Sequence, residues 1–152
     1  MNTKANSSSD STEKRITSVL FVCGMNCIRS PMAERLLKDL CGQEIYCDSA
    51  GANTGEPDGF AITVMKERGL DMENHNSKAL DDLEDLYFDL IITLSPEAHH
   101  RTLDIASGEA VDIEYWPTQD PSTIAGSREE ILKAYRQLRD SLELKIREKF
   151  GK

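Results

Sequence analysis

Cys23 and Arg29, separated by five residues, form the spacing in this sequence that could do chemistry. If a short loop between them closes onto a helix, successive backbone N–H groups point inward and form a cradle for a tetrahedral dianion. Such a cradle favours a thiolate, so Cys23 is expected to be a nucleophile at neutral pH. The planar guanidinium of Arg29 can hold two phosphoryl oxygens, and Ser30 can donate a hydrogen bond to the sulfur. The pattern predicts thiol chemistry on a phosphate-like group.

The other residues of this segment are expected to bind the oxyanion through the cradle. They are Gly24, Met25, Asn26, Cys27, Ile28 and Ser30. A cysteine and an arginine at this spacing also occur by chance, and Cys23 could merely end a buried strand. The chemical interpretation is favoured by the place of the segment, between a predicted strand and a predicted helix, where open α/β sheets bind ligands.

The flanking residues predict that strand and that helix. Residues 18–23 form a continuous apolar run with β-branched and aromatic side chains, typical of a strand covered on both faces. Ser30 can cap the following helix, and Pro31 can occupy its first position. From Met32 to Leu40, apolar residues recur at helical spacing.

The rest of the chain alternates short apolar runs with longer amphipathic ones. Further strands are predicted at 44–48, 88–94 and 112–116, and helices at 60–68, 96–107 and from 128 onward. Ser127 and Glu130 have the spacing of a capping box. The last helix carries one apolar stripe, made of Ile131, Tyr135, Leu138, Leu142 and Ile146. This order predicts an α/β fold: a three-layer α/β/α sandwich around a four-stranded parallel sheet.

Asp120, which precedes Pro121, follows the last predicted strand. The carboxyl ends of parallel strands lie at one edge of a sheet, so this carboxyl group could reach the leaving oxygen of a substrate bound at Cys23. Asp120 is therefore a candidate general acid. The alternative is a turn aspartate before a proline, which has only a local role.

Composition limits the class of protein. The 152 residues include 27 acidic and 18 basic side chains, a net charge of -9, which disfavours binding to nucleic acid or to anionic membranes. Residues 1–14 lack apolar periodicity and predict a disordered tail, leaving one domain at 15–152. No run approaches the roughly 20 apolar residues of a membrane span, and there is no export signal. We expect a cytoplasmic protein with reduced cysteines.

In order along the chain, several segments resemble the low-molecular-weight protein tyrosine phosphatases and the thioredoxin-linked arsenate reductases that share their fold. The matching segments are Val22–Cys23, Asn26, Arg29–Glu34, Asp48–Gly51, His75, Phe88–Asp89 and Asp120–Pro121. The resemblance implies that Cys23 is the nucleophile, Arg29 the phosphate clamp and Asp120 the general acid. It implies a loop-shaping role for Asn26, Ser30, Ser49 and His75.

The sequence also departs from the family pattern. Met25 and Ile28 stand where the family usually has glycine and cysteine. Ser122-Thr123-Ile124 replaces the aromatic residues that typically follow Asp-Pro in the tyrosine phosphatases, although Tyr115, Trp116 or Met25 could line the mouth of the site instead. The reductase branch has a redox cysteine after the Thr-Leu pair, and here that residue is Ser95.

The leading hypothesis is a phosphomonoesterase that acts through a phosphocysteine intermediate on a phosphorylated protein or a small phosphomonoester. It requires no metal and no cofactor, and we expect a monomer. One alternative is an arsenate reductase that uses an external thiol, because the internal relay cysteine is missing. Another is a non-catalytic module that binds phosphate or phosphopeptides.

Overall fold

The computed structural model describes residues 15–151. The predicted tail, residues 1–14, lies outside the described residues. The elements in chain order are β2 (Ser18–Cys23), α2 (Arg29–Cys41), β3 (Tyr46–Gly51), α3 (Gly59–Lys66), η1 (Leu80–Asp82), β4 (Leu90–Thr93), α4 (Pro96–Ile105), β5 (Asp112–Tyr115), η2 (Pro121–Thr123) and α5 (Arg128–Phe150). None of the helices within 15–151 combines the length and the apolar character that a bilayer span requires.

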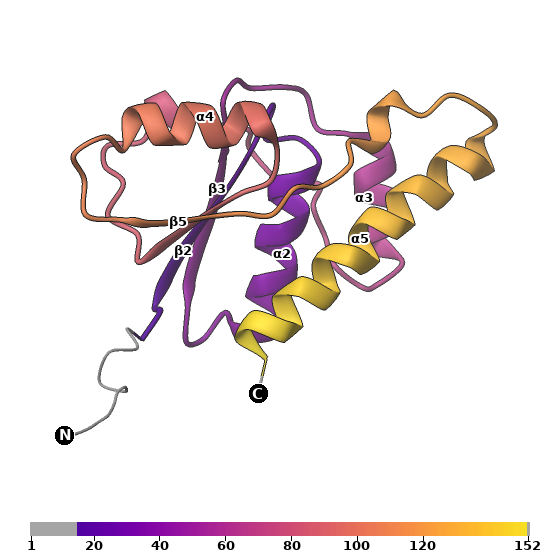
Figure 1. Ribbon diagram of the computed structural model, residues 1–152. Coiled ribbons are helices and arrows are strands. Elements are labelled where there is room, and N and C mark those ends of the chain that lie inside the picture. Colours follow the sequence, from indigo (N-terminus) through magenta and orange to yellow (C-terminus); the bar gives the residue numbers. More distant parts are fainter. Residues whose placement is uncertain (1–14, 152) are drawn as a thin grey trace.

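The four strands form one parallel sheet in the order β3-β2-β4-β5. Helices α2, α3 and α5 cover one face of the sheet, and α4 covers the other (Figure 1). The predicted fold class, a three-layer α/β/α sandwich around a four-stranded parallel sheet, is confirmed. The central position of β2 places the loop that follows it at the middle of the carboxyl edge of the sheet.

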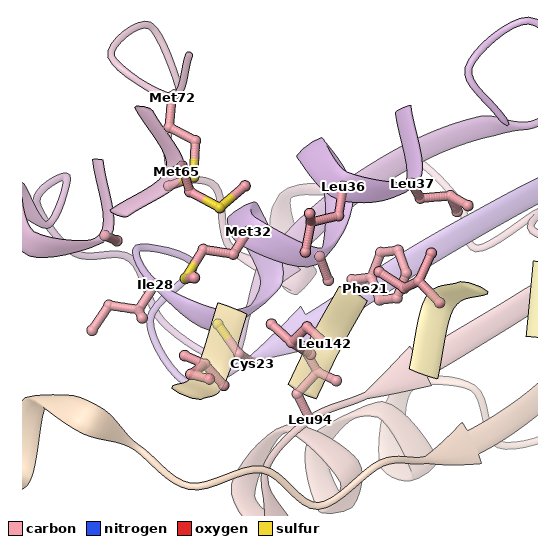
Figure 2. Close-up of a cluster of buried hydrophobic side chains, with 14 of the residues drawn as sticks. Phe21, Cys23, Ile28, Met32, Leu36, Leu37, Met65, Met72, Leu94 and Leu142 are labelled. Carbon is pink, nitrogen blue, oxygen red and sulfur yellow. The ribbon is translucent and has the colours of Figure 1, made fainter. Parts of the chain in front are cut away.

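Side chains of β2 alternate between the two faces, as strand geometry requires. Val19, Phe21 and Cys23 belong to the core beneath α2 and α5, whereas Leu20 and Val22 belong to the core beneath α4. Figure 2 shows Phe21 and Cys23 near apolar side chains of the covering helices. Burying a side chain such as Phe21 contributes about 1.5–3 kcal/mol. Cys23, at the carboxyl end of the strand, is held in the same core by packing.

Two element boundaries that differ from the sequence-based predictions are the starts of α2 and of β3. Helix α2 begins at Arg29, so the prediction that Ser30 caps the helix from outside is wrong. The Ser30 hydroxyl instead contacts Cys23 and Asn26. Strand β3 begins at Tyr46, two residues later than predicted, because the N–H groups of Glu44 and Ile45 donate to the Cys41 carbonyl in a turn after α2.

The capping box at the start of α5 is confirmed: the Ser127 hydroxyl accepts from the Glu130 N–H, and the Glu130 carboxylate accepts from the Ser127 N–H. The predicted stripe packs into the core, with Ile131 partly buried and the other four residues buried.

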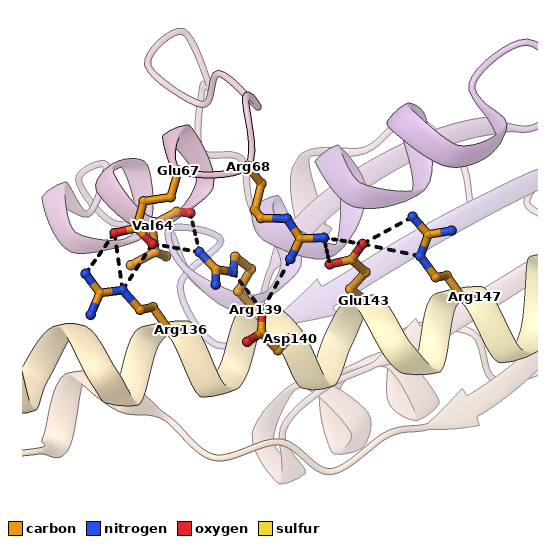
Figure 3. Close-up of polar contacts among 8 residues, drawn as sticks. All are labelled: Val64, Glu67, Arg68, Arg136, Arg139, Asp140, Glu143 and Arg147. Atoms are coloured by element: carbon orange, nitrogen blue, oxygen red, sulfur yellow. Dashed lines mark hydrogen bonds and ion pairs between the residues drawn. The ribbon is translucent and has the colours of Figure 1, made fainter.

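Arginines fasten α5 to α3 (Figure 3). Arg139 is nearly buried; its Nη1 donates to the Val64 carbonyl and to Glu67, both at 2.8 Å. Arg136 also donates to Glu67. Hydrogen bonds from Arg136 and Arg139 lower the pKa of Glu67 to about 2. The two helices are therefore joined by charge-assisted bonds as well as by apolar contact.

Candidate active site

The loop of residues 24–28 connects β2 to α2 and lies against the end of β3. Cys23 pairs with Gly51 in parallel register, and the Asn53 N–H donates to the Gly24 carbonyl at 2.8 Å. A methyl group on Gly51 would lie 2.6 Å from the Asn26 nitrogen and 2.8 Å from the Met25 carbonyl carbon. Only glycine permits this approach, so β3 shapes the loop from outside.

One group of the loop and one of α2 contact the sulfur of Cys23. The Asn26 N–H donates to Sγ at 3.3 Å, and the Ser30 hydroxyl lies 2.9 Å from it. The backbone N–H and the hydroxyl are both groups that can donate a hydrogen bond to this sulfur. The side chain of Cys23 is almost buried, which keeps bulk water from competing for these bonds.

Asn26 is the centre of the network that holds the loop. Its φ of 53° makes it the one non-glycine residue with positive φ between residues 15 and 151, a conformation that asparagine tolerates better than most residues. Its amide Nδ2 donates to the hydroxyls of Ser30 (2.8 Å) and Ser49 (3.0 Å). Its Oδ1 accepts from the Lys78 N–H at 2.9 Å. Met25 has ordinary negative φ, so the absence of glycine there causes no backbone strain.

His75 supports Asn26 from the other side. Its Nε2 lies 3.1 Å from Asn26 Oδ1 and 3.2 Å from the Asn26 carbonyl oxygen. Both oxygens are acceptors, so Nε2 must carry a proton and donate. Burial lowers the pKa of His75 below its ordinary value. The neutral ring with hydrogen on Nε2 satisfies both observations.

The Glu34 carboxylate ends this chain of hydrogen bonds; Glu34 belongs to a segment that resembles the family, but sequence reasoning gave it no role. It accepts from the Ser49 hydroxyl at 2.5 Å and from Lys38 at 2.5 Å. Because Ser49 donates its one hydroxyl proton to Glu34, it must accept from Asn26. A buried acid four residues before a lysine on one helix was the available signal, but that spacing is common on helix surfaces.

Arg29 is oriented by the segment that carries Asp120. Its Nη1 donates to the Thr118 carbonyl at 3.0 Å, and the Thr118 hydroxyl in turn donates to the Leu94 carbonyl at 2.7 Å. Sequence reasoning missed Thr118 because its acceptor is a backbone carbonyl, a group that every type of residue has. This bond brings the guanidinium and the residues after β5 to the same edge of the sheet.

A pocket of about 140 Å³ opens above Cys23. Its lining residues are Cys23, Gly24, Met25, Cys27, Ile28, Arg29, Glu97, Asp120 and Ser122. It therefore brings together Cys23, Arg29 and Asp120 and four of the six predicted substrate-binding residues. The other two, Asn26 and Ser30, are fully buried, and their side chains support the loop beneath the pocket. A larger cavity, between residues 80–87 and α4, shares no lining residue with this pocket.

Asp120 is held in a defined orientation. Its Oδ1 accepts from the N–H (2.9 Å) and the hydroxyl (2.7 Å) of Ser122. Both bonds are made to one oxygen, so Oδ2 remains available for proton transfer. Asp120 also caps η2, and the predicted turn role and a place in the pocket thus coexist.

Cys27 lines the same pocket without resembling a second nucleophile. Burial, followed by the nearby negative charges of Cys23, Asp58 and Asp120, raises the pKa of Cys27 to about 11. Cys27 is therefore a thiol at neutral pH. The four cysteines of the chain are all free.

The aromatic residues considered for the mouth of the pocket lie elsewhere. Trp116 is buried in the core and tilted against Phe21, while Tyr115 stacks on His99. Met25, which is 45% exposed, does lie at the rim. None of the described residues that line the pocket is aromatic.

A cysteine and an arginine at the two ends of a loop, on the central strand of a parallel sheet, define a class of oxyanion-binding sites. Residues 18–150 match the family model of the low molecular weight phosphotyrosine protein phosphatases, and the chain belongs to this family.

Individual relatives differ in their activities. The arsenate reductase of Bacillus subtilis (strain 168) is 30% identical over 130 residues, covering 86% of this chain and 92% of that protein. The low molecular weight protein tyrosine phosphatase of T. tengcongensis has a similar structure, with a TM-score of 0.68, 28% identity, and coverage of 86% of this chain and 95% of that one. The arginine phosphatase YwlE, solved with a phosphorylated active-site serine, gives a TM-score of 0.71, 25% identity, and coverage of 86% and 91%.

Proposed function

We propose that the protein is a cysteine-dependent phosphomonoesterase. The observation that supports this most is the single pocket that contains the Cys23 sulfur, the Arg29 guanidinium and the Asp120 carboxyl group. The substrate is a phosphorylated protein or a small phosphomonoester, with the phosphoryl group bound by the loop N–H groups and by Arg29.

The reaction has two steps. In the first, the Cys23 thiolate attacks phosphorus, the P–O bond of the substrate breaks, and protonated Asp120 gives its proton to the leaving oxygen. In the second, Asp120 accepts a proton from water as the water oxygen attacks the phosphocysteine and releases phosphate. Ser30 donates to the sulfur when Cys23 leaves as a thiolate.

Arsenate reduction is the second candidate, favoured by the activity of the Bacillus subtilis relative. It would require an external thiol, because Ser95, at the relay position, caps α4 by accepting from the Ala98 N–H at 3.2 Å, and no cysteine follows Cys47. Burial raises the pKa of Cys47 well above its ordinary value, which also disfavours a relay through it.

Phosphatase activity is tested by product release from p-nitrophenyl phosphate and phenyl phosphate with a reductant present. Cys23→Ser should abolish turnover of both, whereas the control Cys41→Ser should retain it. Asp120→Ala should lower kcat by about 100-fold or more for phenyl phosphate. The loss should be smaller for p-nitrophenyl phosphate, because nitrophenolate leaves without needing a proton.

The outcomes separate the three candidates. Turnover that survives in Cys23→Ser would reject the cysteine mechanism. Arsenite release that depends on added thiol, without phosphate ester hydrolysis, would favour the reductase. A folded wild type that binds vanadate without either activity would identify a binding module.

A further inference from the structure

Glu97, the second residue of α4, extends over the loop from the other side of the sheet edge. It is one of the pocket-lining residues. A methyl group on Gly24 would lie 3.0 Å from its Oε1, so the carboxylate sits directly above the backbone of the loop. Sequence reasoning missed Glu97, because an acid in the first turn of a helix is usual for its effect on the helix dipole alone.

The charged side chains that line the pocket are mostly acidic. Among the described residues that line it, Arg29 is the one cation, while Glu97 and Asp120 are acids. Asp58, which caps α3, lies close enough to Cys27 that its negative charge raises the pKa of that thiol, although burial raises it more. In the first step Asp120 is protonated, but Glu97 has no part in proton transfer, so its charge repels the incoming dianion.

The walls also lack a surface on which a phenyl ring would stack, since no aromatic residue is found among those that line the pocket. Ser122 occupies the place beside Asp120. Met25 offers an apolar contact at the rim, and the polar groups available there are Ser122, Asp120 and the Glu97 carboxylate.

We propose that Glu97 determines specificity, by selecting substrates that carry a positive charge beside the phosphoryl group. This rests on the proposed phosphatase function. The cation is a guanidinium or an ammonium group that donates to Glu97 while the loop binds the phosphoryl oxygens. As the S–P bond forms, the P–O or P–N bond breaks, its electron pair goes to the leaving atom, and Asp120 protonates that atom.

The positive charge that Glu97 recognises can come from two parts of a substrate, and the experiment distinguishes them. The cation can belong to the phosphorylated side chain itself, as in phosphoarginine, or to an arginine next to a phosphotyrosine. The substrates are free phosphoarginine, a phosphotyrosine peptide flanked by arginines, the matching peptide flanked by glutamines, and p-nitrophenyl phosphate. The measured quantity is kcat/KM for each, in the wild type and in Glu97→Gln.

Glu97→Gln should lower kcat/KM about 10-fold for at least one of the two cationic substrates and raise it for p-nitrophenyl phosphate, because the repulsion is removed. A loss confined to phosphoarginine assigns the cation to the phosphorylated side chain; a loss confined to the arginine-flanked peptide assigns it to a neighbouring residue. The control Glu109→Gln, beyond the C-terminal end of α4, should change none of these values. Glu97 is exposed, so the variant should remain folded, and a thermal melt checks this.

A wild type that hydrolyses p-nitrophenyl phosphate but shows equal changes for cationic and neutral substrates in Glu97→Gln would overturn the inference and leave the phosphatase function standing. A wild type without turnover of any of the four substrates would reject both.

Discussion

The hydroxyl of Ser30 has one proton and two possible acceptors. It already accepts from the Asn26 amide, and it can donate either to the Cys23 sulfur at 2.9 Å or to the Ala50 carbonyl at 3.2 Å. When Cys23 is a thiol it can donate to Ser30, whose proton then goes to Ala50. When Cys23 is a thiolate, Ser30 turns its proton to the sulfur. Because the Ser30 hydroxyl has these two acceptors, it can form hydrogen bonds with Cys23 both as a thiol and as a thiolate.

We therefore expect Ser30→Ala to slow thiol alkylation. A hydrogen bond to a charged acceptor contributes about 1.5–3 kcal/mol, so inactivation by iodoacetamide at pH 6 should slow about 10-fold or more. Ser122→Ala, which removes a hydroxyl bonded to Asp120 and not to the sulfur, is the matched control. An unchanged alkylation rate in Ser30→Ala would mean that the hydroxyl only supports the loop.

The protonation of His75 links the loop to pH. Burial lowers the pKa of His75 in the folded protein, so the unfolded chain binds this proton more readily. The resulting stability is fully present above the unfolded pKa of about 6.5 and is lost as the pH falls through the lower folded value.

We expect the free energy of unfolding, measured in urea at pH 7.5 and at pH 5, to fall with pH and to fall less in His75→Gln, whose amide can still donate to Asn26. His100→Gln, at an exposed position of α4, should keep the wild-type difference. The same pH dependence in all three proteins would exclude His75 as its source.

At the scale of elements, α5 depends on a polar attachment as well as on its apolar stripe. Arg139 is the buried member of that attachment, whereas Arg147 makes an exposed ion pair with Glu143. Removing a nearly buried charge leaves the Val64 carbonyl without its donor.

Arg139→Met should lower the free energy of unfolding by about 2 kcal/mol, because a buried acceptor loses its charged donor. Arg147→Met should cost less than about 0.5 kcal/mol, as is usual for surface pairs. Chemical denaturation of both variants measures the difference. Equal effects would show that burial does not set the contribution of these arginines.

The elements also show where sequence patterns sufficed. Apolar runs located the strands and an apolar stripe located α5, because burial on one or both faces produces a regular sequence pattern. The spacing of Ser127 and Glu130 predicted the capping box. Ser30 was misassigned as a cap because serine at a helix start usually caps, but its other predicted role, a hydrogen bond with the Cys23 sulfur, agrees with the 2.9 Å between the two atoms. The roles of Glu34 and Thr118 were missed because their partners, Ser49 and Arg29, come from other elements.

At the scale of the whole molecule, the pocket assembles residues that lie up to about a hundred positions apart, such as Cys23 and Asp120. The carboxyl edge of a parallel sheet predicted that meeting, since every strand points to it. The position of Glu97 over Gly24 was not predictable, because it depends on the angle at which α4 packs against the sheet.

The net charge of -9 should act on any dianionic substrate before it reaches the loop. Raising the ionic strength from 10 to 150 mM shortens the Debye length from about 30 to about 8 Å. We expect KM for p-nitrophenyl phosphate to fall under this change. Sodium chloride and potassium acetate should give the same result, which separates screening from binding of one anion. A rising KM in both salts would mean that attraction by Arg29 outweighs the surface charge.

The close packing of the loop against Gly51 indicates which positions of the site can be substituted. The loop takes its shape from strand register, from the left-handed Asn26 and from the bare backbone of Gly51, while Met25, Cys27 and Ile28 keep side chains that face the pocket. The residues that set the backbone of the loop, Asn26 and Gly51, thus differ from two that present side chains to the pocket, Met25 and Cys27. Substitutions at 25 and 27 can change what the pocket accepts without changing the backbone of the loop, whereas a single methyl group at 51 would displace the backbone of Met25 and Asn26.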